Sequence, residues 1–360
     1  MRFIHTADVH WGMMPDADMP WSKDRSNDIK ASFRRIIDKA RDTSADCLFI
    51  SGDLFDFQPM NKDLKELNYL FSSIPATHVV IISGEHDYVS PNSALLSFNW
   101  SQNVHWFLSD QVESIYFSDI NTEVYGFSYH AKTLTDTVID TVKPEDNGRI
   151  HILLAHGGDQ NHMPVDISTL SALPFDYIAL GHLNSAAEIE TGKIIYPGSP
   201  EVLSSEDAGD HGYYTGDINP ISHHMDRLTF VKNTDVDYIT VDSAINPKTT
   251  ALSLLSRITQ RMKKYGDQNI FTIRITGKHS PDTELDLSSL RNNYRILEFI
   301  DESEPDYDFS EIYRQHPSDI IGFYIRKLMG EDPSAMSNVE KQALYYGIRA
   351  LLERDKENRT

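Results

Sequence analysis

Three features that are scarce in this sequence limit what the protein can be. Of its 360 residues only Cys47 is a cysteine, which excludes an internal disulfide and fits a reducing, cytoplasmic environment. No run of about 18 apolar residues occurs, so we expect no segment that spans a membrane. The N-terminus has no basic stretch followed by an apolar core, and we therefore expect no secretory signal.

Basic residues are also scarce, since 33 lysines and arginines face 54 aspartates and glutamates and the formal net charge is −21. This charge argues against nonspecific binding of nucleic acid by the chain alone, because phosphate backbones are attracted by clustered cations. It does not exclude a nuclease whose metal ions or basic partner supply the positive charge. The 40% of apolar residues suffices for substantial cores, in one large and one smaller domain.

The chain does contain an alternation of short apolar runs and amphipathic helical patterns. Helices are expected at about 27–41, where Ile29, Phe33 and Ile36 recur at helical spacing, and at 62–72. This alternation of strands and helices is typical of a layered α/β fold. Strands are expected at 3–6, 47–51, 78–83, 123–127, 149–155, 175–180, 193–196 and 212–218.

The pattern changes near residues 219–237. Segments 230–241 and 269–275 are β-like, and a helical pattern lies between them at 249–265. A helix is expected at 310–329, and a second one opens at Ser337 and Glu340, which form a capping-box pattern. We therefore divide the chain into residues 1–218, a small α+β domain at 219–305, and C-terminal helices at 306–360.

Acids, histidines and one amide follow five of the predicted strands. Asp8 and His10 are two positions apart, so both can face one point beyond the carboxyl end of their strand, where α/β sheets place their sites. Carboxylates bind hard divalent cations, and zinc, iron and manganese also accept imidazole. A single such aspartate is usually a turn residue, but five strand ends of this kind indicate a metal site. The other candidates are Asp53 and Asp56; Glu85, His86 and Asp87; His156; and His182 and Asn184.

These motifs resemble those of the calcineurin-like metallophosphoesterase superfamily. Segments 4–10, 52–56 and 196–201 are similar to its DNA-repair exonuclease branch, the SbcD- and YhaO-like proteins. The resemblance covers residues 1–218 and is looser beyond them. It implies a four-layer αββα metallophosphoesterase sandwich, a small α+β capping domain, and C-terminal helices that dock on an SbcC-like coiled-coil ATPase.

The resemblance also implies two divalent metal ions, for which we favour Mn²⁺ over Mg²⁺, Fe or Zn²⁺. Its first ligand set is Asp8, His10, Asp53 and Asn184, and its second is Asp53, Glu85, His156 and His182. Two such ions would share and activate a water for attack on a phosphodiester. His86 would protonate the leaving oxygen, Asp87 would orient His86, and Asp56 would support the ligands from behind. A purely structural turn role for Asp56 and Asp87 stays open.

Two positions depart from the family pattern, which has asparagine where this chain has Glu85 and histidine where it has Asn184. Both substitutes offer oxygen, so metal binding can persist. Three outcomes stay open: an active two-metal phosphodiesterase acting on DNA, a one-metal protein of weak activity, and a scaffold that binds the ATPase or DNA. A small phosphoester is the alternative substrate for an active enzyme.

The remaining predictions concern substrate and partners. Arg25 is a candidate phosphate contact, and His130 and His162 lie in loops that can border the cleft. We expect DNA and the ATPase as partners, allow for a homodimer, and expect no membrane contact. The last helices either pack on their own domain or present Ile320, Phe323, Tyr324, Leu344 and Leu351 to the ATPase.

Overall fold

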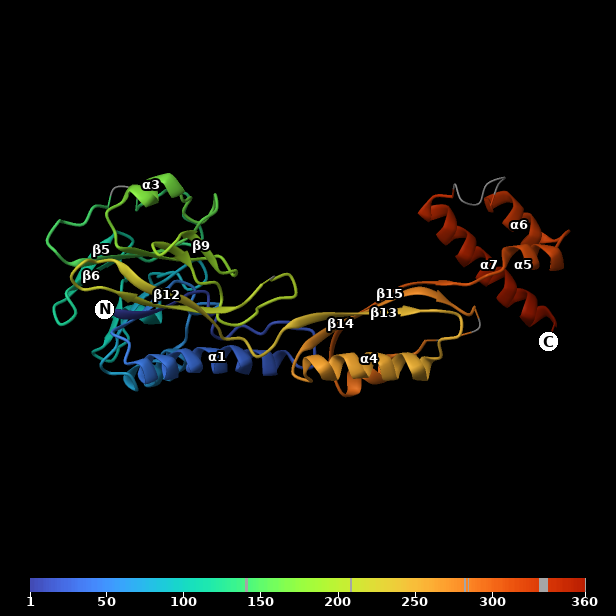
Figure 1. Cartoon of the computed structure of the whole chain (residues 1–360), viewed down its shortest axis with the longest axis horizontal. Helices are drawn as coiled ribbons and strands as arrows, with labels where there is room; N and C mark the ends of the chain where they lie inside the picture. The colour runs from blue at the N-terminus through green and yellow to red at the C-terminus, as the bar shows by residue number, and fades with distance from the viewer. Residues whose placement is uncertain (140–141, 208, 282, 284, 330–335, 360) are drawn as a thin grey trace. The chain divides into compact units, whose positions relative to one another are not determined.

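A computed structural model describes residues 1–139, 142–207, 209–281, 283, 285–329 and 336–359 (Figure 1). The chain forms two units, Met1–Asp237 and Tyr238–Thr360. None of the helices in the described part is both long and apolar enough to cross a membrane.

The first unit contains two six-stranded sheets. In the first sheet β1 to β4 run parallel to their neighbours, while β11 and β12 add antiparallel strands at the β1 side. Its order is β12 (Met225–Lys232), β11 (Gly212–Ile218), β1 (Arg2–Thr6), β2 (Cys47–Ser51), β3 (His78–Ile82) and β4 (Val104–Trp106).

The second sheet has a parallel centre and antiparallel edge strands. Its order is β5 (Glu113–Phe117), β6 (Thr122–Gly126), β7 (Ile150–His156), β8 (Tyr177–Gly181), β10 (Ile194–Tyr196) and β9 (Ala187–Glu190). The central strands β7 and β8 are buried along their whole length, which explains their continuous apolar runs.

Three apolar cores separate four layers. Helices α1 (Ser22–Thr43) and α2 (Asn61–Ser72) cover the outer face of the first sheet, and Phe33 of α1 is fully buried there. Phe3 and Tyr177 meet between the two sheets, and α3 (Ile167–Ala172) covers the second sheet through Leu170. The predicted αββα sandwich is therefore confirmed. A short 3₁₀ turn, η1 (Ala94–Leu96), completes the unit.

The second unit combines a parallel sheet with helices. Leu254, Ile258 and Met262 of α4 (Ala251–Tyr265) are buried in the core beside the sheet. Ile321 and Leu344 lie in a separate core among the last three helices. The remaining elements are β13 (Tyr238–Ile245), β14 (Ile270–His279), η2 (Ser288–Asn292), β15 (Arg295–Pro305), α5 (Phe309–Gln315), α6 (Ile320–Met329) and α7 (Asn338–Arg359).

Two boundaries differ from the prediction. The expected strand at 230–241 is two strands, and β12 pairs with β11 in the first unit, so this unit extends past residue 218 to Asp237. The break has a physical cause, because the Asn233 side chain donates hydrogen bonds to the carbonyl oxygens of Ser32 and Pro200. The expected helix at 310–329 is divided into α5 and α6, whereas the Ser337–Glu340 capping box is present.

Candidate metal centre

The ends of parallel strands from both sheets supply the candidate ligands. Asp8, Asp53 and Glu85 follow β1, β2 and β3 of the first sheet, while His156 ends β7 and His182 follows β8 of the second. Backbone hydrogen bonds join these loops, since the N–H of Asp8 donates to the Gly52 carbonyl at 3.1 Å. The predicted convergence at the carboxyl ends of the strands is thus present.

Four of the predicted ligands have left-handed backbone conformations that non-glycine residues rarely adopt. The φ angles are 52° for Asp8, 49° for His10, 47° for Asp53 and 106° for His182. Each such conformation costs about 1–3 kcal/mol and persists only where the surrounding structure enforces it. Because residues under such strain gather at functional sites, the backbone itself marks this region.

The side chains form overlapping groups whose possible ligand atoms all lie within 4.8 Å of one another. Asp53 belongs to two of these groups, as expected for a residue that bridges two metals. The groups are His10, Asp53 and His86; Asp8, Asp53 and His156; Glu85, His156 and His182; and Asp159, His162 and His182.

Glu85 joins the two histidines of the second ligand set. Its carboxylate oxygens lie 2.6 Å from Nε2 of His156 and 2.8 Å from Nδ1 of His182. His156 has no exposed side-chain surface, and its Nδ1 lies 2.8 Å from the carbonyl oxygen of Ser51, which fixes the ring. Nε2 of His156 also lies 3.6 Å from Asp53, so this half contacts the shared aspartate.

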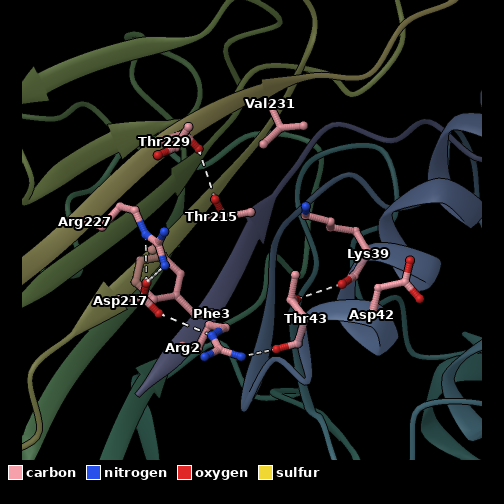
Figure 2. A pocket seen from close by; sticks show the side chains of 11 residues that line it. Arg2, Phe3, Lys39, Asp42, Thr43, Thr215, Asp217, Arg227, Thr229 and Val231 are labelled. Atoms are coloured by element: carbon pink, nitrogen blue, oxygen red, sulfur yellow. Dashed lines mark hydrogen bonds and ion pairs between the residues drawn. The ribbon is translucent and has the colours of Figure 1, made fainter.

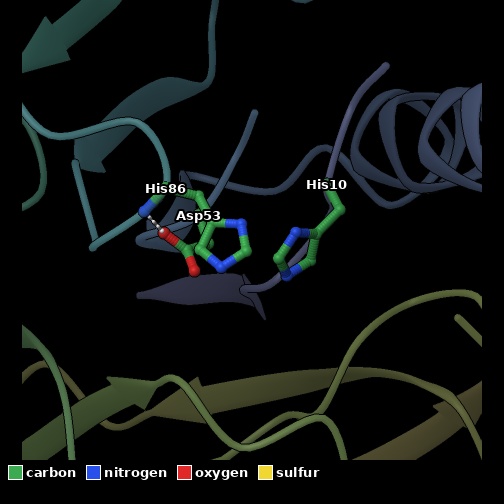
Figure 3. Close-up of side chains that lie close together, drawn as sticks. All are labelled: His10, Asp53 and His86. Atoms are coloured by element: carbon green, nitrogen blue, oxygen red, sulfur yellow. Dashed lines mark hydrogen bonds between the residues drawn. The ribbon is translucent and has the colours of Figure 1, made fainter. Parts of the chain in front are cut away.

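On the other side of Asp53, two imidazoles lie close together (Figure 3). The rings of His10 and His86 are 4.7 Å apart, and the backbone N–H of His86 donates to the Asp53 carboxylate at 3.0 Å. The Asp56 carboxylate lies 3.0 Å from Nδ1 of His10 and 3.6 Å from Nδ1 of His86. Asp56 therefore holds both rings.

The protonation equilibria follow from burial and from these contacts. Burial raises the pKa of Asp8 to about 6, although the positive charge of His156 opposes the shift. Burial acts in the same sense on Asp53, but the neighbouring His156 outweighs it and lowers the pKa of Asp53. The interaction with Asp56 raises the pKa of His86 to about 9, so that His86 is a cation at neutral pH.

Two glycines allow this close packing. A Cβ atom on Gly52 would lie 2.2 Å from Nδ1 of His156, and one on Gly84 would lie 2.4 Å from Oδ1 of Asp53. The sequence predicted that these glycines let the backbone approach a bound ion. In the structure they make room for the ligand side chains themselves.

The donor set fits divalent cations. Asp8 and Asp53 are almost completely buried, and buried carboxylates are normally paired or bound to metal. Among the residues that the structure describes, no lysine or arginine forms an ion pair with Asp8, Asp53 or Glu85. Carboxylates and imidazoles in this arrangement suit Mn²⁺, Mg²⁺, Fe or Zn²⁺.

Four predicted site residues take other places. Arg25 has no exposed surface and contacts Asp28, Glu201 and the carbonyl of Val202, so it cannot reach a substrate phosphate and stabilises α1 instead. Nε2 of His130 lies 2.8 Å from the Leu108 carbonyl and anchors its loop. These placements correct both substrate predictions.

Asp87 is also corrected. Its buried carboxylate accepts hydrogen bonds from the N–H groups of Gly84 and Phe55, at 2.9 and 3.2 Å, so it shapes the turn while Asp56 orients His86. The fourth residue is Asn184, whose Nδ2 lies 3.5 Å from Asp207. Its role as a ligand stays a prediction.

Sequence reasoning missed Asp159. Its Oδ2 lies 2.8 Å from Nε2 of His182 and 2.8 Å from Nδ1 of His162, so it fixes the outer edge of the His182 ring. A signal was available, because Asp159 follows the strand-end His156 and two glycines. The predicted position of His162 at the cleft is supported by this contact.

Two cavities differ in their relation to the metal centre. One, of about 710 Å³, is lined on one side by Asp56, Glu85 and His86 and therefore opens on the centre. The other, of about 400 Å³, lies at the start of β1 (Figure 2). There Arg2 and Arg227 both pair with Asp217, at 3.4 and 2.5 Å, so its charges satisfy one another.

Comparison with known proteins gives relatives of modest identity. The uncharacterized metallophosphoesterase YhaO of Bacillus subtilis (strain 168) is 28% identical over 259 residues, which cover 66% of this chain and 59% of YhaO. The DNA double-strand break repair protein Mre11 of Methanocaldococcus jannaschii is 27% identical over 245 residues, which cover 61% of this chain and 63% of Mre11. The matches thus span about six tenths of each relative.

Among solved structures, TT1561 of Thermus thermophilus matches 55% of this chain and 89% of its own, with 8% identity and a TM-score of 0.34, which adds nothing to the assignment. The profile of the family described as calcineurin-like phosphoesterase matches residues 1–185. That range contains every candidate ligand. The chain therefore belongs to the calcineurin-like phosphoesterase family, whose members are hydrolases that use divalent metal ions.

Proposed function

We propose that this chain is a two-metal phosphodiesterase that cleaves DNA in repair. The observation that carries the proposal is the position of Asp53, which belongs to two donor groups and contacts the backbone of the cationic His86. The His86 side chain is 41% exposed and lines the 710 Å³ cavity, so it can meet a substrate. A buried metal centre with an exposed proton donor suits hydrolysis of a phosphoester.

The chain's own residues have separate tasks in this reaction. Divalent ions, when bound, supply a water of lowered pKa and neutralise charge on the phosphate oxygens. His86 donates a proton to the leaving oxygen, and Asp56 keeps its ring oriented and protonated. Burial of Asp8 and Asp53 excludes water from the inner face of the centre and strengthens their electrostatic interactions.

A phosphodiester of DNA is favoured over a small phosphoester by the similarity to Mre11, which is named as a DNA double-strand break repair protein. The chain's net charge of −21 then calls for positive charge from elsewhere. A cytoplasmic coiled-coil ATPase of the SbcC type would supply it, and a homodimer would place two such centres on one DNA.

The last helices support the ATPase proposal in part. Ile320 and Phe323 of α6 are 68% and 55% exposed, and Val339 of α7 is 75% exposed. Leu344, which we expected on the docking face, is instead buried against α6. We therefore assign docking to the exposed face of α6 and the start of α7, and packing within the unit to Leu344.

Manganese-loaded protein should cleave DNA and hydrolyse a bis-ester such as bis(p-nitrophenyl) phosphate faster than the monoester. Asp53→Asn, which removes one shared carboxylate charge, should reduce both reactions to background and lower the metal content. Equal, slow rates for wild type and Asp53→Asn would overturn the enzyme proposal. Preference for nucleotide monoesters over DNA would favour the small-phosphoester alternative.

The ATPase is tested in full-length protein. Ile320→Asp combined with Phe323→Asp should abolish co-purification with the coiled-coil ATPase, because charges would replace apolar contacts. Ile221→Asp is the matched control, since Ile221 is 91% exposed and lies in the first unit. Unchanged co-purification of the double variant would reject this docking face.

One observation favours a second candidate, a scaffold with weakened catalysis. Glu85 hydrogen-bonds both His156 and His182, so a carboxylate stands where the family pattern has a neutral amide. Its extra negative charge would repel a substrate phosphate. A protein that binds the ATPase and retains metal, yet hydrolyses no phosphoester, would identify this scaffold.

A further inference from the structure

We propose that the 710 Å³ cavity beside His86 binds one nucleoside unit of the substrate, with its base on the aromatic wall formed by Phe57 and Tyr88 and a phosphate at Lys132. This inference rests on the proposed phosphodiesterase function and specifies its substrate. The volume falls within the range of about 300–1,000 Å³ that is usual for small-ligand sites. Because Glu85 and His86 form one wall, a ligand here lies next to the reacting phosphate.

The aromatic wall is partly exposed although its rings are largely apolar. Phe57 is 41% exposed, in a loop that directly follows Asp56 of the metal centre. Its ring lies against the backbone of Gly12, where a Cβ atom would be 2.8 Å from Cζ of Phe57. The position of the ring is therefore fixed by a residue without a side chain. Such a ring suits a nucleobase, because stacking on an aromatic side chain is worth about 1–3 kcal/mol per base.

Hydrogen bonds join the two sides of the aromatic wall before any ligand binds. Nε2 of Gln58 donates to the carbonyl of Tyr88 at 2.8 Å, and Oγ of Ser90 donates to Oε1 of Gln58 at 3.2 Å. The N–H of Val89 donates to the carbonyl of Tyr129 at 2.7 Å. A preformed wall reduces the entropy lost on binding.

Lys132 provides the cation on the opposite loop. It is exposed, and the described residues contain no ion-pair partner for its ammonium group. The loop is anchored at both ends, by His130 on the Leu108 carbonyl and by the Leu134 N–H, which donates to Asn161 at 2.9 Å. An unpaired lysine in a chain of net charge −21 attracts phosphate to this particular place.

The combination selects the ligand. A phosphate alone would use Lys132 but not the rings, and an apolar ligand would use the rings but not the lysine. A nucleotide uses both, and it also places a phosphodiester bond at His86. This distinguishes a nucleoside subsite from a general cleft.

Two phosphodiesters with the same leaving group test the proposal: methyl p-nitrophenyl phosphate and the thymidine p-nitrophenyl phosphates substituted at the 5′ or the 3′ oxygen. We expect wild type to prefer a thymidine ester. In Phe57→Ala and Phe57→Leu the ratio of kcat/KM between that ester and the methyl ester should fall about 10-fold, which equals 1.4 kcal/mol. Phe57→Tyr should keep the ratio, because it keeps the ring.

Tyr69→Ala is the matched control, since Tyr69 is 75% exposed on α2 and does not line the cavity. A second readout needs no metal: saturation-transfer NMR with thymidine 5′-monophosphate on chelator-treated protein. Base protons should receive transfer in wild type and in Tyr69→Ala, and lose it in Phe57→Leu and Lys132→Ala.

Failure of this inference and of the proposed function are separable. Hydrolysis of the methyl ester without preference for thymidine, or equal transfer in Phe57→Leu, would overturn the nucleoside subsite alone. Hydrolysis of neither ester with transfer retained would overturn the enzyme and leave the subsite in place.

Discussion

The two halves of the metal centre share Asp53 but differ in how completely the protein assembles them. In the half formed by Glu85, His156 and His182, both nitrogens of each imidazole have partners at 2.6–2.8 Å. In the half that contains Asp8 and His10, the predicted fourth ligand Asn184 lies 3.5 Å from Asp207. His10 is paired with Asp56.

This difference indicates unequal metal affinity. A carboxylate between two oriented imidazoles offers charge and preset geometry, so the Glu85 half should hold its cation more tightly. The Asp8 half has an amide where the family pattern has an imidazole, and its affinity should be lower and shifted towards Mn²⁺ or Mg²⁺. The effects of substitutions should therefore differ between the halves.

The largest effect is expected where the halves touch. Gly84→Ala would place a methyl group 2.4 Å from Oδ1 of Asp53 and 2.6 Å from Nε2 of His156. Both halves would be displaced, so activity should fall to background and elemental analysis should find neither metal. Gly148→Asn is the control, because nothing lies within 4 Å of that position and asparagine tolerates its φ of +71°. A Gly84→Ala protein with two metals would refute the geometry described here.

The next effect concerns His86, which lies beside the Asp8 half. His86→Gln should lower kcat by about 10²- to 10⁴-fold, the usual contribution of a positioned proton donor, while the metal content stays the same. Single-turnover kinetics and metal analysis measure the two quantities separately. Loss of a metal ion in His86→Gln would instead make His86 a ligand, in agreement with its grouping with His10 and Asp53.

A smaller effect is expected from the outer contact of the Glu85 half. Asp159→Asn would weaken the hold on His182 and should lower metal affinity about 10- to 100-fold in this half only. Titration of chelator-treated protein with Mn²⁺, followed by paramagnetic resonance, would show one weakened site. Asp110→Asn, at an exposed position away from the centre, should bind as wild type does. If Asp159→Asn weakened both sites equally, the halves would not be independent.

Asp159 also shows what the sequence does not reveal. The strand-end ligands were predictable because alternation and short glycine turns are local signals, and the helical spacing of α1 was read for the same reason. β15 was missed because only Ile296 is buried along it and its second half is acidic. Asp159 and Lys132 lie in loops, where no period marks a residue that faces a site.

Two wrong roles have the same kind of cause. Arg25 was placed in a loop, but α1 begins at Ser22, and its buried partner Glu201 is 176 residues away in sequence. Asp56 and Asp87 each follow a strand end by a few residues. Only the folded chain shows that Asp56 faces the imidazoles while Asp87 faces the backbone.

The smallest effect, and the one that most sharpens the comparison, is expected from Asn184→His. The Asn184 carbonyl accepts the N–H of Ser199 at 3.0 Å, so the backbone at this position is fixed whatever the side chain. An imidazole there would complete the Asp8 half, and the hydrolysis rate at limiting Mn²⁺ should rise severalfold while the Glu85 half keeps its affinity. Asn184→Ala is the control and should lower occupancy of the Asp8 half. If neither variant changes rate or occupancy, Asn184 is not at the metal, and the difference between the halves must then come from Glu85 alone.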